Sequence, residues 1–215
     1  LFLVVLLPLF LIAIYYPPNN YDSMTYHLPR VEHWIQNKNV DFYKTNNSRQ
    51  LFLAPMAEYI ILHWRLLAGE DYFVNLVQYV SMILSIIVAA LIVKHYKGGE
   101  LAELLSVVLV ATIPMGILQS TSTQNDYVTA FFVIASLYFF LKDNIFFLSL
   151  CIGLGIFTKN TYVIFVLPLG VYWLFIWIKK KKFEVWKRIS LILFFILLIN
   201  GAHLYRNLKY FGSPF

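Results

Sequence analysis

Two acidic residues and one lysine have residue types and positions that could support chemistry in this chain. Asp22 follows the first apolar run and the rigid pairs Pro17-Pro18 and Asn19-Asn20, so turn residues fix its distance from that run. Asp126 ends a hydroxyl- and amide-rich stretch that begins at Gln119, and Lys159 stands alone between two apolar runs. A carboxylate could accept a proton as a general base, and a lysine could hold a phosphate.

Two of these residues also have a structural interpretation. Asp126 at the start of an apolar helix could cap free backbone donors, which stabilises a helix by about 0.3–1 kcal/mol. Lys159 could extend its side chain to a membrane interface. The functional interpretation of Asp126 depends on its facing the same compartment as Asp22.

The composition indicates that membrane-spanning helices position these groups. Of the 215 residues, 60% are hydrophobic and 13% are charged, whereas soluble domains have about 25% charged residues. The 17 basic and 11 acidic residues are too few to give a polar surface, so we expect lipid to cover the chain. The single cysteine, Cys151, excludes a disulfide within the chain.

A membrane-spanning helix needs about 17–25 mostly apolar residues. Apolar runs of this length, or slightly shorter, recur along the chain. We predict an all-α, polytopic membrane protein with about seven transmembrane helices, in a single transmembrane domain over 1–215. The predicted spans are 1–16, 72–93, 101–119, 127–141, 145–158, 161–178 and 189–205. Because the chain begins and ends abruptly, we expect it to be the N-terminal portion of a longer protein.

Basic residues predict the orientation of these spans. The short connections 94–100, 142–144 and 179–188 hold much of the positive charge, including the run Lys179 to Lys182, and are expected to be cytoplasmic. We attribute the net charge of +6 to this asymmetry and expect no nucleic-acid partner. The opposite, extracytoplasmic side then receives the first outer loop 17–71, the second outer loop 119–126, residues 159–160 and the stretch after 205. We expect a multi-pass protein of the plasma (inner) membrane with its active site on that outer side.

The first outer loop contains two predicted interfacial helices. Over 22–35, apolar residues recur at spacings of three and four, and Pro29 should bend or split the helix. Its opposite face should present Asp22, Tyr26, Arg30 and His33. A second helix is predicted over 55–69, where Glu58 is expected to pair with Arg65 or Arg49. Besides Lys159, planar guanidinium groups could hold a phosphate, and the candidates are Arg30, Arg49 and Arg206.

Several segments resemble those of a known group of enzymes. They are Tyr21-Asp-Ser-Met-Thr-Tyr-His-Leu-Pro-Arg30, Pro55-Met-Ala-Glu58, Ile113-Pro-Met-Gly-Ile-Leu-Gln-Ser-Thr-Ser-Thr-Gln-Asn-Asp126, Phe157-Thr-Lys159, Arg206-Asn and Phe211-Gly-Ser-Pro214. The chain resembles polytopic glycosyltransferases of the GT-C fold. More narrowly, it is similar to the protein mannosyltransferase-like and aminoarabinose transferase-like families, which use polyprenyl-phosphate sugars.

The resemblance implies a role for particular residues. Asp22 matches a catalytic acid in the first outer loop, Asp126 a second acid, and Lys159 a basic group for the donor phosphate. Further substrate- or phosphate-binding candidates are Tyr26, His27, Arg30, Arg49, Glu58 and Arg206. The implied partners are a lipid-linked sugar donor and a lipid, glycan or protein acceptor. The sequence departs from many relatives at Asp22-Ser23, where they have an Asp-Glu pair, and at Leu53-Ala54, where they have a basic residue before two prolines.

Alternatives remain open at the level of the sequence. Asp22 and Asp126 could chelate a divalent cation instead of acting as base and second acid. The chain could also be half of a transporter or flippase, or a non-catalytic membrane subunit. The near absence of charge in the middle of the predicted spans is evidence against a transporter.

Overall fold

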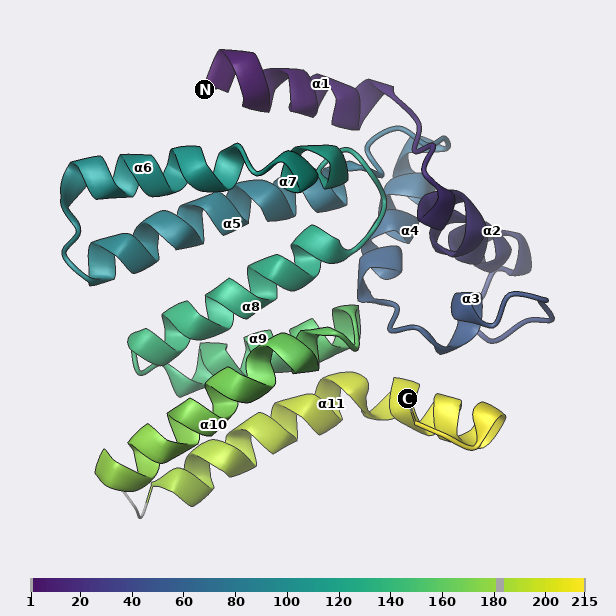
Figure 1. The fold of residues 1–215 in the computed structure, drawn as a ribbon. Coiled ribbons are helices and arrows are strands. Elements are labelled where there is room, and N and C mark those ends of the chain that lie inside the picture. The colour runs from purple at the N-terminus through teal and green to yellow at the C-terminus, as the bar shows by residue number, and fades with distance from the viewer. Residues whose placement is uncertain (1, 181–183, 215) are drawn as a thin grey trace. The chain divides into compact units, whose positions relative to one another are not determined.

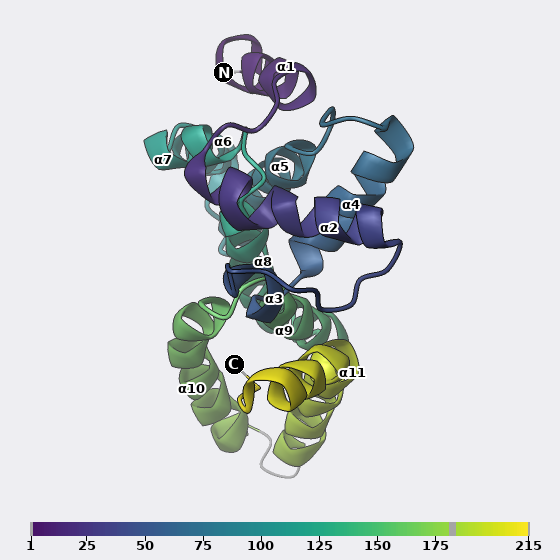
Figure 2. The ribbon, with the colours of Figure 1, turned by 90° about the vertical axis from the view of Figure 1, so that its right-hand side faces the viewer.

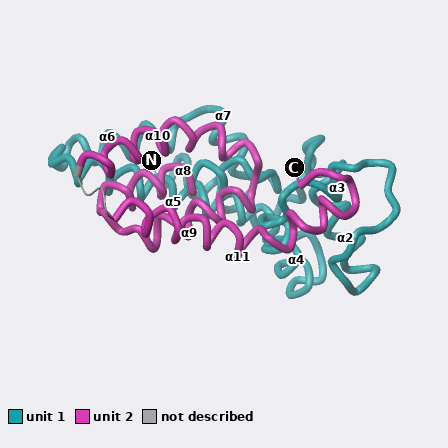
Figure 3. Tube along the Cα trace, turned by 90° about the horizontal axis from the view of Figure 1, so that it is seen from below, with its two compact units in different colours: residues 1–131 teal, residues 132–215 magenta. Residues whose placement is uncertain are grey.

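A computed structural model describes residues 2–180 and 184–214, and these residues form helices without any strand (Figure 1). This confirms the predicted all-α class. Lys181 and Lys182 of the predicted basic run lie outside the described residues. The chain divides into two compact units, Leu1–Phe131 and Phe132–Phe215, with the boundary inside one helix (Figure 3). The single transmembrane domain over 1–215 stays a prediction.

The helices follow one another through short connections except in the first outer loop. In the first unit they are η1 (Phe2–Leu6, a π-helix), α1 (Leu7–Tyr15), η2 (Ser23–His27, a π-helix), α2 (Leu28–Asn37), α3 (Arg49–Phe52), α4 (Met56–Ala68), α5 (Leu76–His95), α6 (Gly99–Ala111) and α7 (Pro114–Gln119). Helix α8 (Asp126–Leu141) crosses the boundary, and α9 (Ile145–Thr158), α10 (Tyr162–Lys180) and α11 (Val185–Phe211) follow.

Three of these helices are long and apolar enough to cross a membrane, namely α5, α10 and α11. Three shorter apolar helices cover Leu3–Tyr15, Asp126–Leu141 and Ile145–Thr158. A polytopic, all-helical membrane protein is therefore the correct fold class. The predicted continuous helix over 101–119 is wrong, since it breaks between α6 and α7. Pro114 begins α7 and forces Ile113 into an extended conformation, which ends the preceding helix.

Within the first unit, α5 and α6 lie side by side and α1 packs against α5 (Figure 1). Their apolar core includes Leu9 of α1 and Met82 of α5. Two polar contacts fix α1 to α5: the Asn75 side chain donates to the carbonyl of Tyr16 at 2.9 Å, and the Tyr79 hydroxyl donates to the carbonyl of Leu6 at 3.1 Å. These contacts hold the exit of α1, from which the first outer loop starts.

The two predicted helices of the first outer loop are present. Helices α2 and α4 pack on each other, and Figure 2 shows them side by side. The π-helical turn η2 ends at His27, two residues before Pro29, and the bend expected at this proline stays a prediction. Helix α4 ends at Gly69, whose φ of 76° is a left-handed conformation that glycine adopts without strain.

The predicted division of the first of these helices into apolar and polar faces is partly wrong. Met24 is 55% exposed, whereas Arg30 is 1% exposed and Tyr26 is buried. The carbonyls of Arg49, Gln50 and Leu53 accept hydrogen bonds from the Arg30 side chain, which is removed from solvent. Neighbouring segments, and not helix periodicity alone, therefore decide which residues of the helix are covered.

In the second unit, α9 and α11 run parallel to each other. Arg188 at the start of α11 donates to Asp143 just before α9 at 3.1 Å, and Phe157 near the end of α9 meets the ring of His203. The two helices approach closely at Gly153, where a Cβ atom would lie 2.7 Å from the Ile199 side chain and 3.0 Å from a backbone oxygen. The predicted cytoplasmic connection 142–144 and the start of α11, at the end of the predicted cytoplasmic connection 179–188, thus lie at the same end of this unit.

Candidate active site

Asp22 is positioned by the turn that starts the first outer loop. The side chain of Asn20 accepts a hydrogen bond from the backbone N–H of Ser23 at 2.8 Å, and its carbonyl accepts one from Met24 at 3.1 Å. This pattern begins the helical segment and leaves Asp22 half-buried on its first turn. The turn chemistry predicted for the Asn19-Asn20 pair therefore sets where Asp22 lies.

Both predicted acids raise the pKa of one tyrosine, Tyr26. Burial raises the pKa of the Tyr26 hydroxyl, the charge of Asp22 and a hydrogen bond with it raise the pKa further, and so does the charge of Asp126. Arg49 opposes this shift, and its guanidinium carbon lies 5.9 Å from the centre of the Tyr26 ring. We call Asp22, Tyr26, Arg49 and Asp126 the acid cluster. Because its pKa is raised, the Tyr26 hydroxyl of this cluster stays protonated at any physiological pH and can donate a hydrogen bond.

Two contacts join the first and second outer loops at the acid cluster. The Gln124 amide donates to Oδ2 of Asp22 at 3.2 Å, and the backbone N–H of Thr123 donates to the Ser23 hydroxyl at 3.3 Å. Our sequence analysis did not single out Gln124 or Ser23 as site residues. Gln124 lies inside the polar stretch before Asp126, so its residue type indicated a possible polar contact. Its partner could not be predicted, because Asp22 is 102 residues away.

Asp126 begins α8, as predicted, but another residue caps the helix. The buried Gln78 side chain of α5 accepts hydrogen bonds from the backbone N–H groups of Tyr127 and Val128, at 2.8 and 3.3 Å. The next amide, that of Thr129, donates to the carbonyl of Asn125. These three amides are therefore bound without the Asp126 carboxylate, while the helix macrodipole still favours an acid at this position.

Three other candidates form a separate group in the interior. His27 Nδ1 lies 2.8 Å from Oε1 of Glu58, and the Arg30 guanidinium lies 3.5 Å from the same oxygen. All three side chains are almost fully buried. Arg30 also donates to the carbonyls of Arg49, Gln50 and Leu53. We call His27, Arg30 and Glu58 the buried ion cluster.

Electrostatics keeps Glu58 of this cluster ionised. Burial alone would raise the pKa of Glu58, but the charge of Arg30 and the hydrogen bond with His27 outweigh burial and lower it. The predicted pairing of Glu58 with Arg65 or Arg49 is wrong. Arg65 instead pairs with Glu32 and, at 3.3 Å, with Asp71. Helix α4 turns Glu58 toward α2, which is why Glu58 meets His27 and Arg30.

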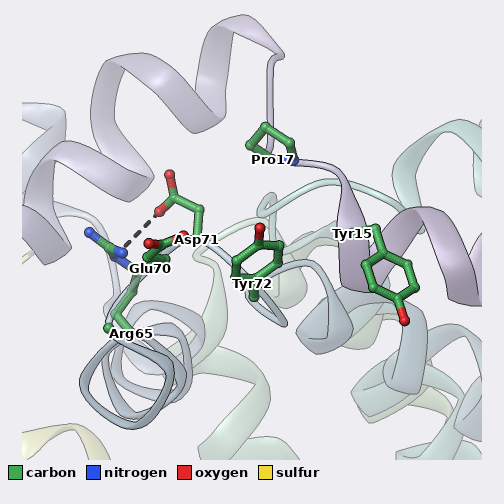
Figure 4. Close-up of a pocket in the computed structure, with 7 residues that line it drawn as sticks. Tyr15, Pro17, Arg65, Glu70, Asp71 and Tyr72 are labelled. Carbon is green, nitrogen blue, oxygen red and sulfur yellow. Dashed lines mark ion pairs between the residues drawn. The ribbon is translucent and has the colours of Figure 1, made fainter.

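A cavity of about 390 Å³ opens beside this Arg65 ion pair (Figure 4). It lies where α1 ends and where the connection from α4 to α5 begins. Its lining residues are Tyr15, Pro17, Arg65, Gly69, Glu70, Asp71 and Tyr72. A second cavity of about 370 Å³ shares Arg65 and Asp71 with the first and extends along Met24 and Leu28. Neither cavity contains a residue of the acid cluster.

Two basic candidates lie at one end of the second unit. Lys159 follows the last residue of α9 in an extended conformation and is half-buried. Arg206 is also half-buried and stands three residues after His203, whose ring faces Phe157 at 6.1 Å. Because Phe157 precedes Lys159 by two residues, the two basic groups share this end of the parallel pair α9 and α11.

The acid cluster contains two carboxylates that a divalent cation could use as ligands. Among residues 2–180 and 184–214, no group of three or more His, Cys, Asp and Glu side chains is placed to hold a metal ion. Magnesium, however, is usually held by one or two carboxylates together with waters and substrate phosphates. Chelation of a cation by Asp22 and Asp126 therefore stays a hypothesis.

The fold defines a polytopic, all-helical membrane protein, and the acid cluster lies where the segment of η2 and the helix α8 begin. A family model described as dolichyl-phosphate-mannose-protein mannosyltransferase matches residues 53–200. The chain belongs to this family, which confirms the resemblance to protein mannosyltransferases and makes it a mannosyltransferase-like glycosyltransferase. The family implies a membrane context, a lipid-linked sugar donor and an acceptor. No curated protein and no solved structure shows significant similarity to the chain.

Proposed function

We propose that this chain transfers a sugar from a polyprenyl-phosphate donor to an acceptor hydroxyl on the extracytoplasmic side of the membrane, with inversion at the anomeric carbon. The observation that carries the proposal is the acid cluster. It brings two half-buried carboxylates and an exposed guanidinium around one tyrosine. Family membership supplies the reaction class to which this chemistry is applied.

Asp22 is the base in this proposal. It accepts the proton of the acceptor hydroxyl while the oxygen forms a bond to the anomeric carbon. The bond from that carbon to the phosphate oxygen breaks, its electron pair stays on the phosphate, and polyprenyl phosphate leaves. A single displacement of this kind inverts the anomeric carbon. The charge of Asp126 favours the positive charge that develops on the sugar ring in the transition state.

Cations hold the departing phosphate. Arg49 is exposed next to the two acids and offers a planar, bidentate fork, which suits a phosphate. Lys159 and Arg206 share one end of the second unit and are assigned the same task. His27, Arg30 and Glu58 were also substrate-binding candidates, but they are buried and bound to one another, so we assign them a structural role.

The extracytoplasmic location rests on the sequence and on the ends of the helices. In the first unit, contacts bring residues 16, 23, 75, 78, 123 and 127 together at the end away from the connection of α5 to α6. The basic residues Lys94 and Lys97 in that connection favour the cytoplasm for the other end. We therefore propose a plasma membrane enzyme with an outward-facing site.

Substitution of the proposed residues tests the function. In the full-length protein, Asp22→Asn, Asp126→Asn and Lys159→Ala should each insert normally and lower sugar transfer by about 100-fold or more, since each removes a charge that acts in the transition state. The assay follows radiolabel from mannosyl phosphoryl polyprenol into membranes of a deletion strain. Asp41→Asn, an exposed acid of the same loop, is the matched control and should keep wild-type transfer. Unchanged transfer in all three variants would refute the site.

Mass spectrometry identifies the sugar and the acceptor. Envelope glycans and glycoproteins of the deletion strain should lack one sugar that the wild-type strain carries. The wild-type gene should restore that sugar, and the Asp22→Asn gene should not. Identical glycans in both strains would contradict transfer to the cell envelope.

A further inference from the structure

We propose that Gln124 is a positioning residue for Asp22, whose carboxylate it holds in one orientation through Oδ2. The inference rests on the proposed function, because it assumes that Asp22 is the base. Its direct observation is the hydrogen bond from the Gln124 amide to Oδ2 of Asp22, at 3.2 Å.

The backbone around Gln124 is fixed on both sides. Before it, the Thr123 N–H group donates to the buried Ser23 hydroxyl, next to Asp22 itself. The Gln124 N–H group donates to the Ser122 hydroxyl at 3.3 Å, and that hydroxyl donates to the carbonyl of Gln119 at 2.9 Å. The short stretch that carries Gln124 is thus tied both to itself and to the helix that carries Asp22.

The helix after Gln124 is fixed as well. Gln78 binds the first amides of α8, so the helix start that follows Gln124 is attached to α5. A side chain between two anchored segments can hold a carboxylate in one orientation. Because a misplacement of about 1 Å at a reacting group can cost about 100-fold in rate, such an anchor has a measurable effect.

An amide suits this task better than a cation would. A lysine or arginine at this position would form an ion pair and make the carboxylate a poorer base. The neutral amide N–H orients the carboxylate without adding a charge. The second donor to Asp22 is the hydroxyl of Tyr26, which stays protonated because its pKa is raised. Two neutral donors from two different loops therefore define the orientation of the base.

The test separates positioning from other roles. In the full-length protein, Gln124→Ala should lower kcat for transfer from mannosyl phosphoryl polyprenol by about 10- to 100-fold, with KM for this donor unchanged, because the base loses its orientation and not its identity. Gln36→Ala, an exposed glutamine of the same outer side, is the matched control and should keep wild-type kinetics. Wild-type kcat in Gln124→Ala would overturn the inference.

A double variant tests whether Gln124 acts through Asp22. Added to Asp22→Asn, Gln124→Ala should lower the residual transfer no further, because the group it positions is already gone. A further loss of the same size as in the single variant would overturn the inference. If Asp22→Asn alone keeps wild-type transfer, Asp22 is not the base and the proposed function is refuted. Loss in Asp22→Asn with wild-type kinetics in Gln124→Ala refutes only the role of Gln124.

A near-isosteric variant provides a readout that a merely structural role would not change. Gln124→Glu fills the same space but places a second carboxyl group beside Asp22, and two adjacent carboxyl groups cannot both ionise easily. The acidic limb of the pH profile of kcat/KM should therefore move to higher pH, while transfer recovers as the pH rises. An acidic limb at the wild-type pH would contradict the contact.

Discussion

The acid cluster and the buried ion cluster each take two side chains from the same short helical segment, residues 22–30, and combine similar kinds of groups. Asp22 and Tyr26 of the acid cluster are followed along this segment by His27 and Arg30 of the buried ion cluster. Each cluster combines carboxylate, aromatic or imidazole, and guanidinium groups. One is half-open and the other is closed, because α4 brings Glu58 against His27 and Arg30 and residues 49–53 cover the Arg30 side chain.

The difference shows that residue type and helical spacing do not by themselves identify a site. In the buried ion cluster, backbone carbonyls and Glu58 bind the charged atoms, so a substrate cannot reach them. In the acid cluster, Asp22 and Asp126 are half-buried and Arg49 is exposed. A charged group that is partly open and held by neutral donors is suited to chemistry, whereas one closed by an opposite charge holds the fold together.

The largest expected effect comes from breaking the buried ion cluster. Glu58→Ala removes the carboxylate that faces Arg30 and His27 in the interior, and loss of one partner of a buried pair costs about 3–5 kcal/mol. We expect a large fall in the unfolding temperature of the protein in detergent micelles, followed by fluorescence. Glu70→Ala, at an exposed acid just after α4, should leave the unfolding temperature unchanged. Equal stability of the two variants would refute a structural role for Glu58.

The same comparison predicts a dependence of stability on pH. The folded-state pKa of Glu58 lies below its ordinary value of 4.5, so its ionised form stabilises the fold. This stability is fully present above about pH 4.5 and is lost as the pH falls through the lower, folded-state pKa. Unfolding temperatures between pH 3 and 6 should therefore fall less steeply at the acidic end in Glu58→Gln than in the wild type, because glutamine does not titrate. Parallel curves would contradict the lowered pKa.

Much of the segment that carries both clusters could be predicted from the sequence, but their separation could not. Apolar spacing predicted its helix, and the Asn19-Asn20 pair predicted the turn before Asp22, whereas the bend expected at Pro29 stays a prediction. These are local effects of neighbouring residues. Which charged groups are buried depends on α4, whose Glu58 is 31 residues from His27. No local pattern specifies that contact.

The second outer loop gives the same lesson. The start of α8 at Asp126 was predicted from the change from polar to apolar residues. The cap that binds its amides is Gln78, which lies 49 residues earlier in a predicted span. A polar residue inside an apolar run was a signal that it has a partner, but the run does not say which one. Because this cap is distant in the sequence, the sequence alone left both a capping role and a catalytic role open for Asp126.

The smallest expected effect concerns Arg49, where the two clusters meet. Its carbonyl accepts a hydrogen bond from Arg30 of the buried ion cluster, while its side chain lies over Tyr26 of the acid cluster. Substitution of the side chain preserves the backbone contact, so Arg49→Ala should change the free energy of unfolding by less than about 0.5 kcal/mol. Loss of a charged hydrogen bond to the donor phosphate should raise KM for mannosyl phosphoryl polyprenol by about 10-fold.

Conservative and control variants refine this prediction. Arg49→Lys keeps the charge but loses the bidentate fork, so its KM should lie between those of the wild type and Arg49→Ala. Lys44→Ala, an exposed cation of the same segment, should leave KM unchanged. If Arg49→Ala destabilised the protein as much as Glu58→Ala and left KM unchanged, the side chain would belong to the buried ion cluster. The acid cluster would then consist of Asp22, Tyr26 and Asp126 without Arg49.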